Sequence, residues 1–329
     1  MLCKIHNKPQ GELCMVKALG QPRRKYNWKS YWVRHWALYA MLLAPIAFFA
    51  IFSYWPMINI LIAFMTNNIR IPVLENTADR WVGLDNFRWA FANPQFRDAV
   101  RNTLMFSFLD LALGFPMPII LALLFNELKF KRFKKVTQTI SYMPFFLSWI
   151  IVGGLMLRLF RTETGAINNV LVNWFGLEPI PFLTSSRHWV FTNVFTAIWR
   201  GLGWNTIIYL AAITAVNPEL YEAADMDGAK RLRKMWHITL PGIRPVIVTL
   251  LILTLGGIMG ADMARFLSTE TLLVRDVSNV LPIFVFRWGI EGSQFHRAAA
   301  VGLIASIINL IILFSANFIS RKVSGSGLW

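Results

Sequence analysis

The sequence predicts an all-α integral membrane protein, and its composition, its apolar runs and the distribution of its lysines all indicate this class. The 329 residues are 56% hydrophobic and 15% charged, whereas soluble proteins usually carry about 25% charged residues. Six apolar runs each reach the roughly 20 helical residues that a bilayer core requires. The chain is therefore expected to cross a membrane six times.

The predicted transmembrane helices lie at about 37–64, 102–125, 137–159, 189–215, 240–262 and 298–319. Residues 1–36 are interpreted as a cytoplasmic tail with an interfacial helix, and residues 37–329 as the transmembrane domain. The stretch RRKYNWKSYWVRHW before the first span mixes basic residues with Trp, as interfacial anchors do. The first run exceeds the apolar core of about 7–15 residues in a removable signal peptide, which favours an uncleaved lead-in. Two cysteines, Cys3 and Cys14, fall in this tail, where the cytosol keeps thiols reduced, so no disulfide or metal framework is expected.

The orientation follows from the positions of the basic residues. With the N-terminus inside, all twelve lysines, from Lys4 to Lys322, and twenty of the 33 Lys and Arg residues fall on the inner side. The positive-inside rule then places both termini in the cytoplasm. The net charge of +16 is explained by topology and by attraction to anionic lipid. It indicates membrane lipid, and not nucleic acid, as a partner.

The inner loop between the fourth and fifth spans contains NPELYEAADMDG, which has the features of a short helix. Asn217 suits the N-cap, Pro218 the first helical position, and Gly228 the left-handed residue after the helix. About ten residues cannot span a membrane, and the acidic side chains would be costly inside one. We therefore expect this helix in the cytoplasm or at its interface, connected at Pro241 to the fifth span.

One face of this short helix is low in profile. At helical spacing Leu220, Ala223, Ala224 and Asp227 lie together, with Glu222 projecting beside them. Small side chains allow a helix to sink into a groove on another protein. The alternative interpretation is an ordinary connector whose charges are solvated.

The loop 216–241 also carries a spaced motif. E-A-A, three residues, G, nine residues and I-x-L-P are present as Glu222, Ala223, Ala224, Gly228, Ile238, Leu240 and Pro241. This spacing resembles the signature of the membrane subunits of binding-protein-dependent ABC importers. WVGLDNF at 81–87, SYMPFF at 141–146 and GLGWNTIIYLAAI at 201–213 are similar to MalF-type carbohydrate permeases. The terminal GLW resembles the branch that serves larger oligosaccharides, including alginate-type systems.

The resemblance implies a type I ABC importer permease fold in the bacterial inner membrane. It implies that the short helix is a coupling helix that docks on a dimer of cytoplasmic ATPase subunits, with Glu222 facing a cation there and Asp227 on the docking face. A second permease, expected to be a different chain, and an extracytoplasmic solute-binding protein complete the implied assembly. ATP and Mg²⁺ belong to the partner ATPase.

The sequence predicts a subunit without catalytic activity of its own. It contains no G-x-x-x-x-G-K-[ST] phosphate loop, no nucleophile motif and no metal-ligand spacing. No bound cofactor and no metal are therefore expected on this chain.

Ionisable residues within predicted spans are candidates for the transport pathway. Asp110 and Arg200 lie at depths that differ by only about 5 Å along their spans, so they are expected to pair or to line one cavity. A purely structural ion pair is the alternative. Trp149, Trp204 and Asn205 offer the flat apolar faces and hydrogen-bonding groups that sugars require.

Three other functions stay open at this point. An ion-coupled secondary transporter would use Asp110 and Arg200 as a relay, although it leaves the capped inner helix unexplained. A membrane scaffold or sensor would use the inner loop to recruit a partner. An ABC permease for a solute other than a sugar shares the same motif and topology, and the sequence does not name the cargo.

Overall fold

The structure is a computed structural model that describes residues 28–66, 77–325 and 327–328. Within these ranges it is helical, with an isolated bridge between Met65 and Trp81 and no longer strand. This confirms the predicted all-α class. Residues 1–27, with Cys3, Cys14 and most of the predicted cytoplasmic tail, lie outside the described residues, and the division at residue 36 stays a prediction.

The chain forms two compact units, Met1–Met57 and Ile58–Trp329. The first contains α1 (Trp28–Phe49), η1 (Ala50–Tyr54) and the start of η2 (Trp55–Phe64). From Trp36 to Met57 most of the large apolar side chains are exposed. A helix that is apolar all round is typical of a membrane span.

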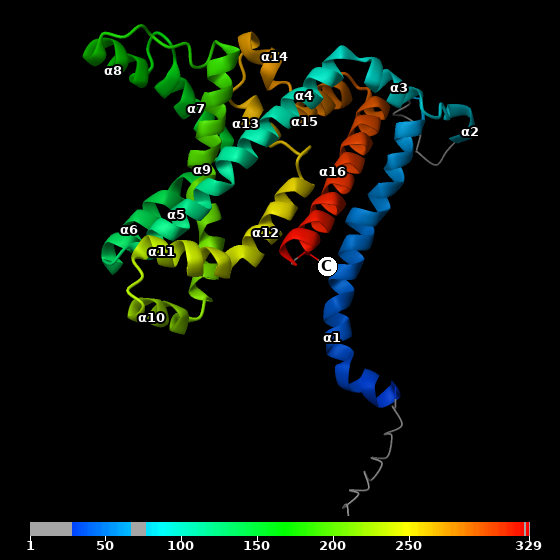
Figure 1. Cartoon of the computed structure of the whole chain (residues 1–329). Helices are drawn as coiled ribbons and strands as arrows, with labels where there is room; N and C mark the ends of the chain where they lie inside the picture. The colour runs from blue at the N-terminus through cyan, green and yellow to red at the C-terminus, as the bar shows by residue number, and fades with distance from the viewer. Residues whose placement is uncertain (1–27, 67–76, 326, 329) are drawn as a thin grey trace, which may run out of the picture. The chain divides into compact units, whose positions relative to one another are not determined.

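The second unit is a bundle of helices (Figure 1). Its first half consists of α2 (Thr77–Arg80), α3 (Asp85–Ala92), α4 (Pro94–Leu109), η3 (Asp110–Gly114), α5 (Pro116–Glu127), α6 (Lys131–Tyr142), η4 (Met143–Phe146), α7 (Trp149–Phe160), α8 (Ala166–Phe175) and α9 (Ser186–Thr214). Its second half consists of α10 (Pro218–Met226), α11 (Arg231–Lys234), η5 (Met235–Thr239), α12 (Leu240–Gly256), α13 (Met263–Leu267), η6 (Leu272–Val274), α14 (Arg275–Ser278), α15 (Leu281–Phe286), η7 (Arg287–Glu291) and α16 (Phe295–Ser324).

Four helical segments of the described chain are long and apolar enough to cross a membrane. They are His35–Phe64, Pro94–Glu127, Arg231–Gly256 and Phe295–Lys322. Each overlaps a predicted span, although the fifth predicted span ends at Gly256 and not at residue 262. Gly257, Gly260 and the loop that follows end the helix before the predicted boundary.

The third predicted span, 137–159, is not one straight helix. Lys131–Phe146 and Trp149–Phe160 meet at an angle of 102°. Pro144 lies in the short η4 helix, Leu147 is extended, and the Ser148 hydroxyl caps α7 by accepting from the Ile151 amide. A proline followed by a new N-cap starts a second helix in a new direction. Counted as one broken span, the pair raises the number of candidate spans to five.

The fourth predicted span corresponds to α9, which is 29 residues long but is not among the segments apolar enough to count as a span. It carries Asn193, Arg200 and Asn205, and it packs against α5, α6 and α12. Of these, Asn193 is buried, Arg200 is partly buried and Asn205 lines an interior cavity, so they face other parts of the bundle instead of lipid. A central helix needs less hydrophobicity than one surrounded by lipid.

Close helix contacts hold this bundle together at glycines. A Cβ on Gly203 of α9 would lie 2.0 Å from the carbonyl oxygen of Ser141 in α6, so only glycine fits there. At Gly256 of α12 a Cβ would lie 2.8 Å from Leu313 of α16, which fits the close contact expected of small residues in membrane helices. Gly260, the second glycine of the GxxxG pattern, lies beyond the end of α12.

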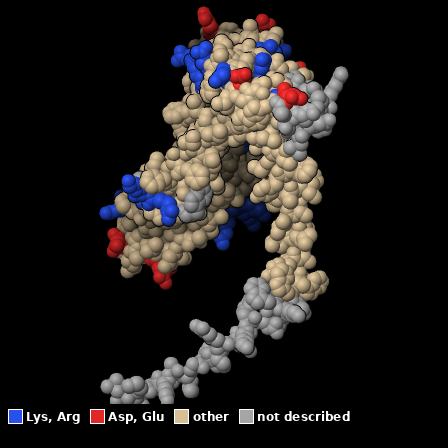
Figure 2. Space-filling view, turned by 90° about the vertical axis from the view of Figure 1, so that its right-hand side faces the viewer, with Lys and Arg blue, Asp and Glu red and all other residues tan. Residues whose placement is uncertain are grey.

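Charged side chains gather at the two ends of this unit in the face shown in Figure 2, with a band of other residues between them. The apolar band and the charged ends are the pattern expected for helices that cross a bilayer. At one end lie α10 and α11, and at the other lie α3, α14 and the start of α16 (Figure 1). The two ends thus carry the charged surface that a membrane interior would exclude.

Candidate functional site

The short helix predicted between the fourth and fifth spans is present as α10, with the predicted ends. The side-chain oxygen of Asn217 accepts from the Glu219 amide at 3.1 Å, and Pro218 occupies the first turn. Gly228 has a φ of +71°. The Gly228 amide donates to the Asp225 carbonyl, and the Ala229 amide to the Ala224 carbonyl. These two bonds form a Schellman motif, so both ends of α10 are fixed by local contacts.

Two side-chain contacts connect α10 to the helices that follow. The Tyr221 hydroxyl lies 2.9 Å from the Thr239 hydroxyl at the start of the apolar segment, and Thr239 is buried. The Lys234 ammonium donates to the Asp225 carboxylate at 2.6 Å. The α10 helix is therefore connected to η5 and α11, which lead into α12, by side-chain contacts as well as by the chain itself.

The motif residues divide into an exposed group and a partly buried group. Glu222, Ala223, Asp227 and Gly228 are exposed, and Ala224 is partly so. Large apolar neighbours are exposed as well, with Leu220 at 52% and Met226 at 89%. A helix that leaves carboxylates and such apolar area uncovered has the surface of a docking element. Ile238 and Leu240 are half-buried where η5 meets α12, while Pro241 is exposed there.

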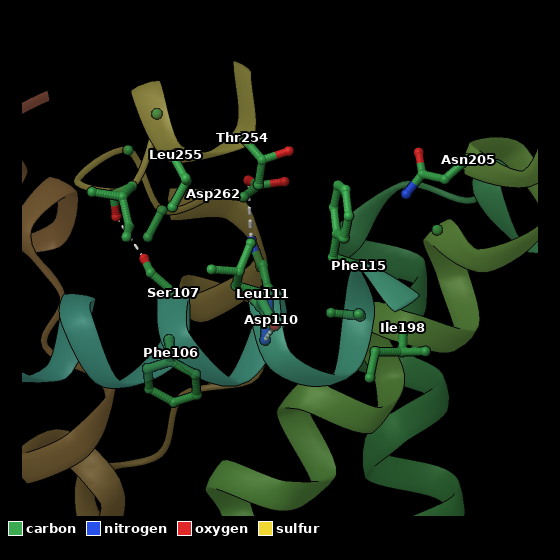
Figure 3. Close-up of a pocket in the computed structure, with 18 of the residues that line it drawn as sticks. Phe106, Ser107, Asp110, Leu111, Phe115, Ile198, Asn205, Thr254, Leu255 and Asp262 are labelled. Carbon is green, nitrogen blue, oxygen red and sulfur yellow. Dashed lines mark hydrogen bonds and ion pairs between the residues drawn. The ribbon is translucent and has the colours of Figure 1, made fainter. Parts of the chain in front are cut away.

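The interior of the bundle contains a cavity of about 360 Å³ between η3, α5, α9 and the segment from α12 to α13. Figure 3 shows its polar groups, which come from all sides: Ser107, Asp110, Asn205, Thr254 and Asp262. Apolar walls are supplied by Phe106, Leu111, Phe115, Ile198 and Leu255. An apolar pocket with a few convergent hydrogen-bonding groups is the usual form of a small-molecule site.

The charge of Asp110 is neutralised by Arg265. Two guanidinium nitrogens donate to its carboxylate at 2.6 and 3.2 Å, and the third, Nε, donates to the Asn193 side-chain oxygen at 2.7 Å. The Arg265 side chain is 7% exposed and that of Asp110 is 38% exposed. Both residues line the cavity, and Asp110 presents the more exposed side chain of the pair to it.

The expected pairing of Asp110 with Arg200 is wrong. Arg200 does not line the cavity; its Nε donates to the Leu147 carbonyl at 2.9 Å, and its guanidinium lies 4.7 Å from the Trp149 ring centre. The carbonyl of Leu147 is left without a helical partner at the bend between η4 and α7. Arg200 thus stabilises this bend, and similar depth along two spans was insufficient to identify the partner of Asp110.

The other predicted pathway residues have different places. Asn205 lines the cavity. Trp149 donates through its indole nitrogen to Asp262 at 2.5 Å, and so borders the cavity through that carboxylate. Trp204 stacks on Phe145, with ring centres 4.5 Å apart, and packs at the bend.

Arg265 was not predicted as a functional residue, because it follows the predicted fifth span, 240–262, and only ionisable residues within spans were candidates. A signal was available: Asp262 precedes it by three residues, and the Asp262 carboxylate caps α13 by accepting from the Ala264 and Arg265 amides. This cap turns the chain back toward the bundle, which brings Arg265 to Asp110. A buried carboxylate in a span needs a cation, and that cation need not lie in another span.

The arrangement defines a class of protein: a polytopic helical membrane protein with a polar interior cavity and a capped, exposed helix at one end. Comparison with known proteins makes this specific. The chain belongs to the family described as binding-protein-dependent transport system inner membrane components, whose sequence profile matches residues 114–325. It is thus a membrane component of an ABC importer in the bacterial inner membrane.

Two relatives come from Bacillus subtilis (strain 168). The polygalacturonan/rhamnogalacturonan transport system permease protein YteP is 42% identical over 89% of this chain and 90% of that protein. Protein LplB is 40% identical over 92% of this chain and 94% of that protein. Among solved structures, a chain of a bacterial ABC transporter involved in the import of the acidic polysaccharide alginate is 37% identical, with a TM-score of 0.82 over 90% of this chain and 99% of that chain. The bacterial alginate transporter has also been solved in complex with an alginate pentasaccharide-bound periplasmic protein.

Proposed function

We propose that this chain is one permease subunit of an ATP-driven importer for a carbohydrate, an oligosaccharide, and that α10 couples it to a cytoplasmic ATPase. The observation that carries the proposal is α10 itself, a helix capped at both ends, exposed along its motif face, and joined to a span by Tyr221 and Thr239. Membership in the importer family and the names of the relatives support the transport role and the class of cargo.

The coupling step follows from the geometry of the loop. Binding of α10 in a cleft of the ATPase places Glu222 against a cation of that partner, and Asp227 lies on the same docking face. Movement of the ATPase subunits then pulls α10, and the Tyr221–Thr239 contact carries the displacement into α12. ATP and Mg²⁺ bind to the ATPase dimer and not to this chain.

The topology proposed for this role has six crossings and both termini in the cytoplasm. Four apolar segments, the bent pair α6–α7 and the polar central helix α9 supply them. With the lysines of the described bundle, from Lys129 to Lys322, on the α10 side, the opposite end of the bundle faces outward. A second permease subunit, a different chain, supplies the other half of the pathway, and an extracytoplasmic solute-binding protein delivers the cargo there.

The cavity between η3, α9 and α12 is the proposed contact with the cargo. Asp110, Asn205 and Asp262 offer acceptors and donors for hydroxyl groups. The relatives include importers of the acidic polysaccharides named above, and an acidic, alginate-like oligosaccharide is one cargo that this similarity supports. The Arg265 guanidinium already donates to Asp110 and Asn193, so it is less available to a carboxylate of the cargo. The cavity therefore favours hydroxyl groups over carboxylates as ligands.

The experiment is purification of the tagged chain from its membrane, followed by reconstitution of the co-purifying subunits in lipid vesicles. The proposal expects an ATPase, a second permease, and ATP hydrolysis stimulated by a loaded solute-binding protein, with galacturonate oligomers and alginate pentasaccharide as the first cargoes. Uptake that survives removal of ATP but stops when a proton gradient is dissipated would instead identify a secondary transporter. Stable isolation without any ATPase would favour the scaffold interpretation.

A further inference from the structure

A second pocket is lined by residues of α4, α14 and η7. In Figure 1, α14 lies at the end of the bundle opposite α10. It has a volume of about 560 Å³. Gln95 and Asp98 in the first turns of α4 form one side, and Arg275 on α14 and Gln294 before α16 contribute to the rest. None of these residues belongs to the cavity around Asp110.

Two aromatic residues, Phe284 and Trp288, form the apolar part of this pocket. Phe284 is buried, and its ring lies 5.8 Å from that of Trp288 and 6.2 Å from that of Trp89. The indole nitrogen of Trp288 donates to the Gln95 side chain at 3.3 Å, and its ring meets Trp89 edge to face at 4.8 Å. These contacts fix the Trp288 ring, which is only partly buried and so presents a preformed apolar surface to the pocket.

The charges of the pocket are largely compensated by the protein itself. Arg287 donates to both carboxylate oxygens of Glu270 at 2.7 Å, and the Arg275 Nε lies 3.4 Å from the same carboxylate. The Glu270 side chain is only 9% exposed, so both guanidinium groups are anchored from behind. A guanidinium already paired with a carboxylate has less to offer a second one.

The remaining polar groups are suited to hydroxyls. The amides of Gln95 and Gln294 can both donate and accept, the exposed Asp98 carboxylate accepts, and the outer N–H groups of Arg275 donate. The lining carries two arginines, Arg275 and Arg287, and two carboxylates, Asp98 and Asp276, so its charges balance. An aromatic surface surrounded by mixed donors and acceptors matches the apolar ring face and the equatorial hydroxyls of a sugar unit. It matches a phosphate or a polyanion poorly.

We propose that this pocket is an outer saccharide subsite, separate from the cavity around Asp110, that holds a sugar unit of the cargo through its ring face and hydroxyls. The proposal rests on the proposed carbohydrate transport. Asp98 and Asp110 are about 18 Å apart along the axis of α4 at 1.5 Å per residue, so the two sites lie in sequence along one helix. An oligosaccharide entering from the outer side meets the Trp288 pocket before it reaches the cavity.

The test uses the complete importer in nanodiscs, without its solute-binding protein, titrated with maltopentaose and with alginate pentasaccharide. The expected result is saccharide binding that Trp288→Ala and, independently, Asp98→Leu weaken by about tenfold, close to the loss of one good hydrogen bond. Asp98 is exposed, so its replacement keeps the proposal testable if Trp288→Ala fails to fold. Trp174→Ala removes an exposed Trp of α8 outside the pocket and is expected to bind like the wild type.

Three outcomes would overturn the subsite. They are unchanged affinity in both pocket variants, absence of saccharide binding to a wild-type importer that still takes up sugar, and, in a parallel measurement with the solute-binding protein added, loss of its association in the pocket variants while saccharide binding is unchanged. The last result would make the pocket a protein-docking surface. Failure of the proposed function is distinguishable, because the wild-type importer would then take up no saccharide even with its solute-binding protein present.

Discussion

The α10 helix and the cavity around Asp110 both place charged residues in a mostly apolar chain, in opposite ways. On α10, Glu222 and Asp227 project into solvent, and the Asp225 partner of Lys234 is 61% exposed. In the cavity, Arg265 is enclosed and all three of its nitrogens are engaged. Exposed charges contribute little to stability, whereas removal of one member of a buried pair is costly. The charges of α10 are thus available to a partner, and those of the cavity hold the bundle together.

The largest effect expected is on transport, at α10. Glu222→Lys reverses the charge that faces the ATPase, and uptake into vesicles is expected to fall at least about 100-fold, since like charges at a docked interface cost several kcal/mol. The matched control is Glu219→Lys in the first turn of the same helix. That change costs only about 0.3–1 kcal/mol of local helix stability by opposing the dipole.

Normal uptake by Glu222→Lys would show that the exposed charges of α10 are not used in coupling to the ATPase. Equal losses in both variants would mean that uptake depends on the net charge of α10 and not on its docking face. The amount of folded protein recovered in detergent should be unchanged in both.

The next effect is on stability, in the cavity. Arg265→Met leaves Asp110 without its cation, and we expect a loss of about 2–3 kcal/mol, less than for a fully enclosed pair because Asp110 reaches the cavity. The measurement is unfolding in detergent against denaturant. Arg88→Met, which breaks the exposed pair with Asp85, is expected to cost less than about 1 kcal/mol.

A double variant sharpens this result. Asp110→Leu combined with Arg265→Met removes both charges, and it should recover part of the loss seen in Arg265→Met alone. Strictly additive losses would show that the ion pair is not the interaction that stabilises this region.

A third prediction concerns packing and not charge. Gly256→Val puts side-chain atoms where Leu313 of α16 now lies, and overpacking of this kind costs about 1–3 kcal/mol. The same unfolding experiment measures it, and Leu313→Ala in the same chain should restore part of the stability. If Leu313→Ala lowers the free energy of unfolding of Gly256→Val further, the close contact between α12 and α16 is not present in the membrane.

The smallest effect is expected at the N-cap of α10. Asn217→Ala removes the acceptor of the Glu219 amide, at a cost of about 1 kcal/mol to this helix. Faster amide hydrogen exchange at the start of α10, with the rest of the bundle unchanged, is the expected readout. No change in exchange would indicate that Pro218 and the partner contacts, and not the cap, define the helix start.

Local features were predictable from the sequence, and long-range ones were not. The ends of α10 follow from residues within one turn of each end, Asn217, Pro218 and Gly228, and the structure has them where the spacing predicts. Four apolar segments were found for the same reason, since hydropathy depends on neighbouring residues. The 102° bend between α6 and α7 was not predicted, although Pro144 is present in the sequence. A proline alone does not determine whether a span kinks or breaks.

The cavity was only partly predictable. Asp110 and Asn205 were identified as polar residues within spans, and both line it. The partner of Asp110 is 155 residues away in the sequence, and its position depends on how α13 turns back after Asp262. Ser107 and Thr254 could not be predicted as cavity residues from the sequence, because hydroxyl groups in membrane helices commonly donate to the backbone of their own helix.

The proposed coupling to ATP hydrolysis requires that α10 is the part of this chain that binds the ATPase. Hydrogen exchange of the permease, with and without its ATPase partners, measures this directly. Protection of the amides of residues 219–229 on ATPase binding, with Glu222→Lys abolishing it and the helices around Arg265 unchanged, is the predicted result. An α10 that exchanges equally fast in the bound and free states, in an assembly shown to be intact, would contradict the claim.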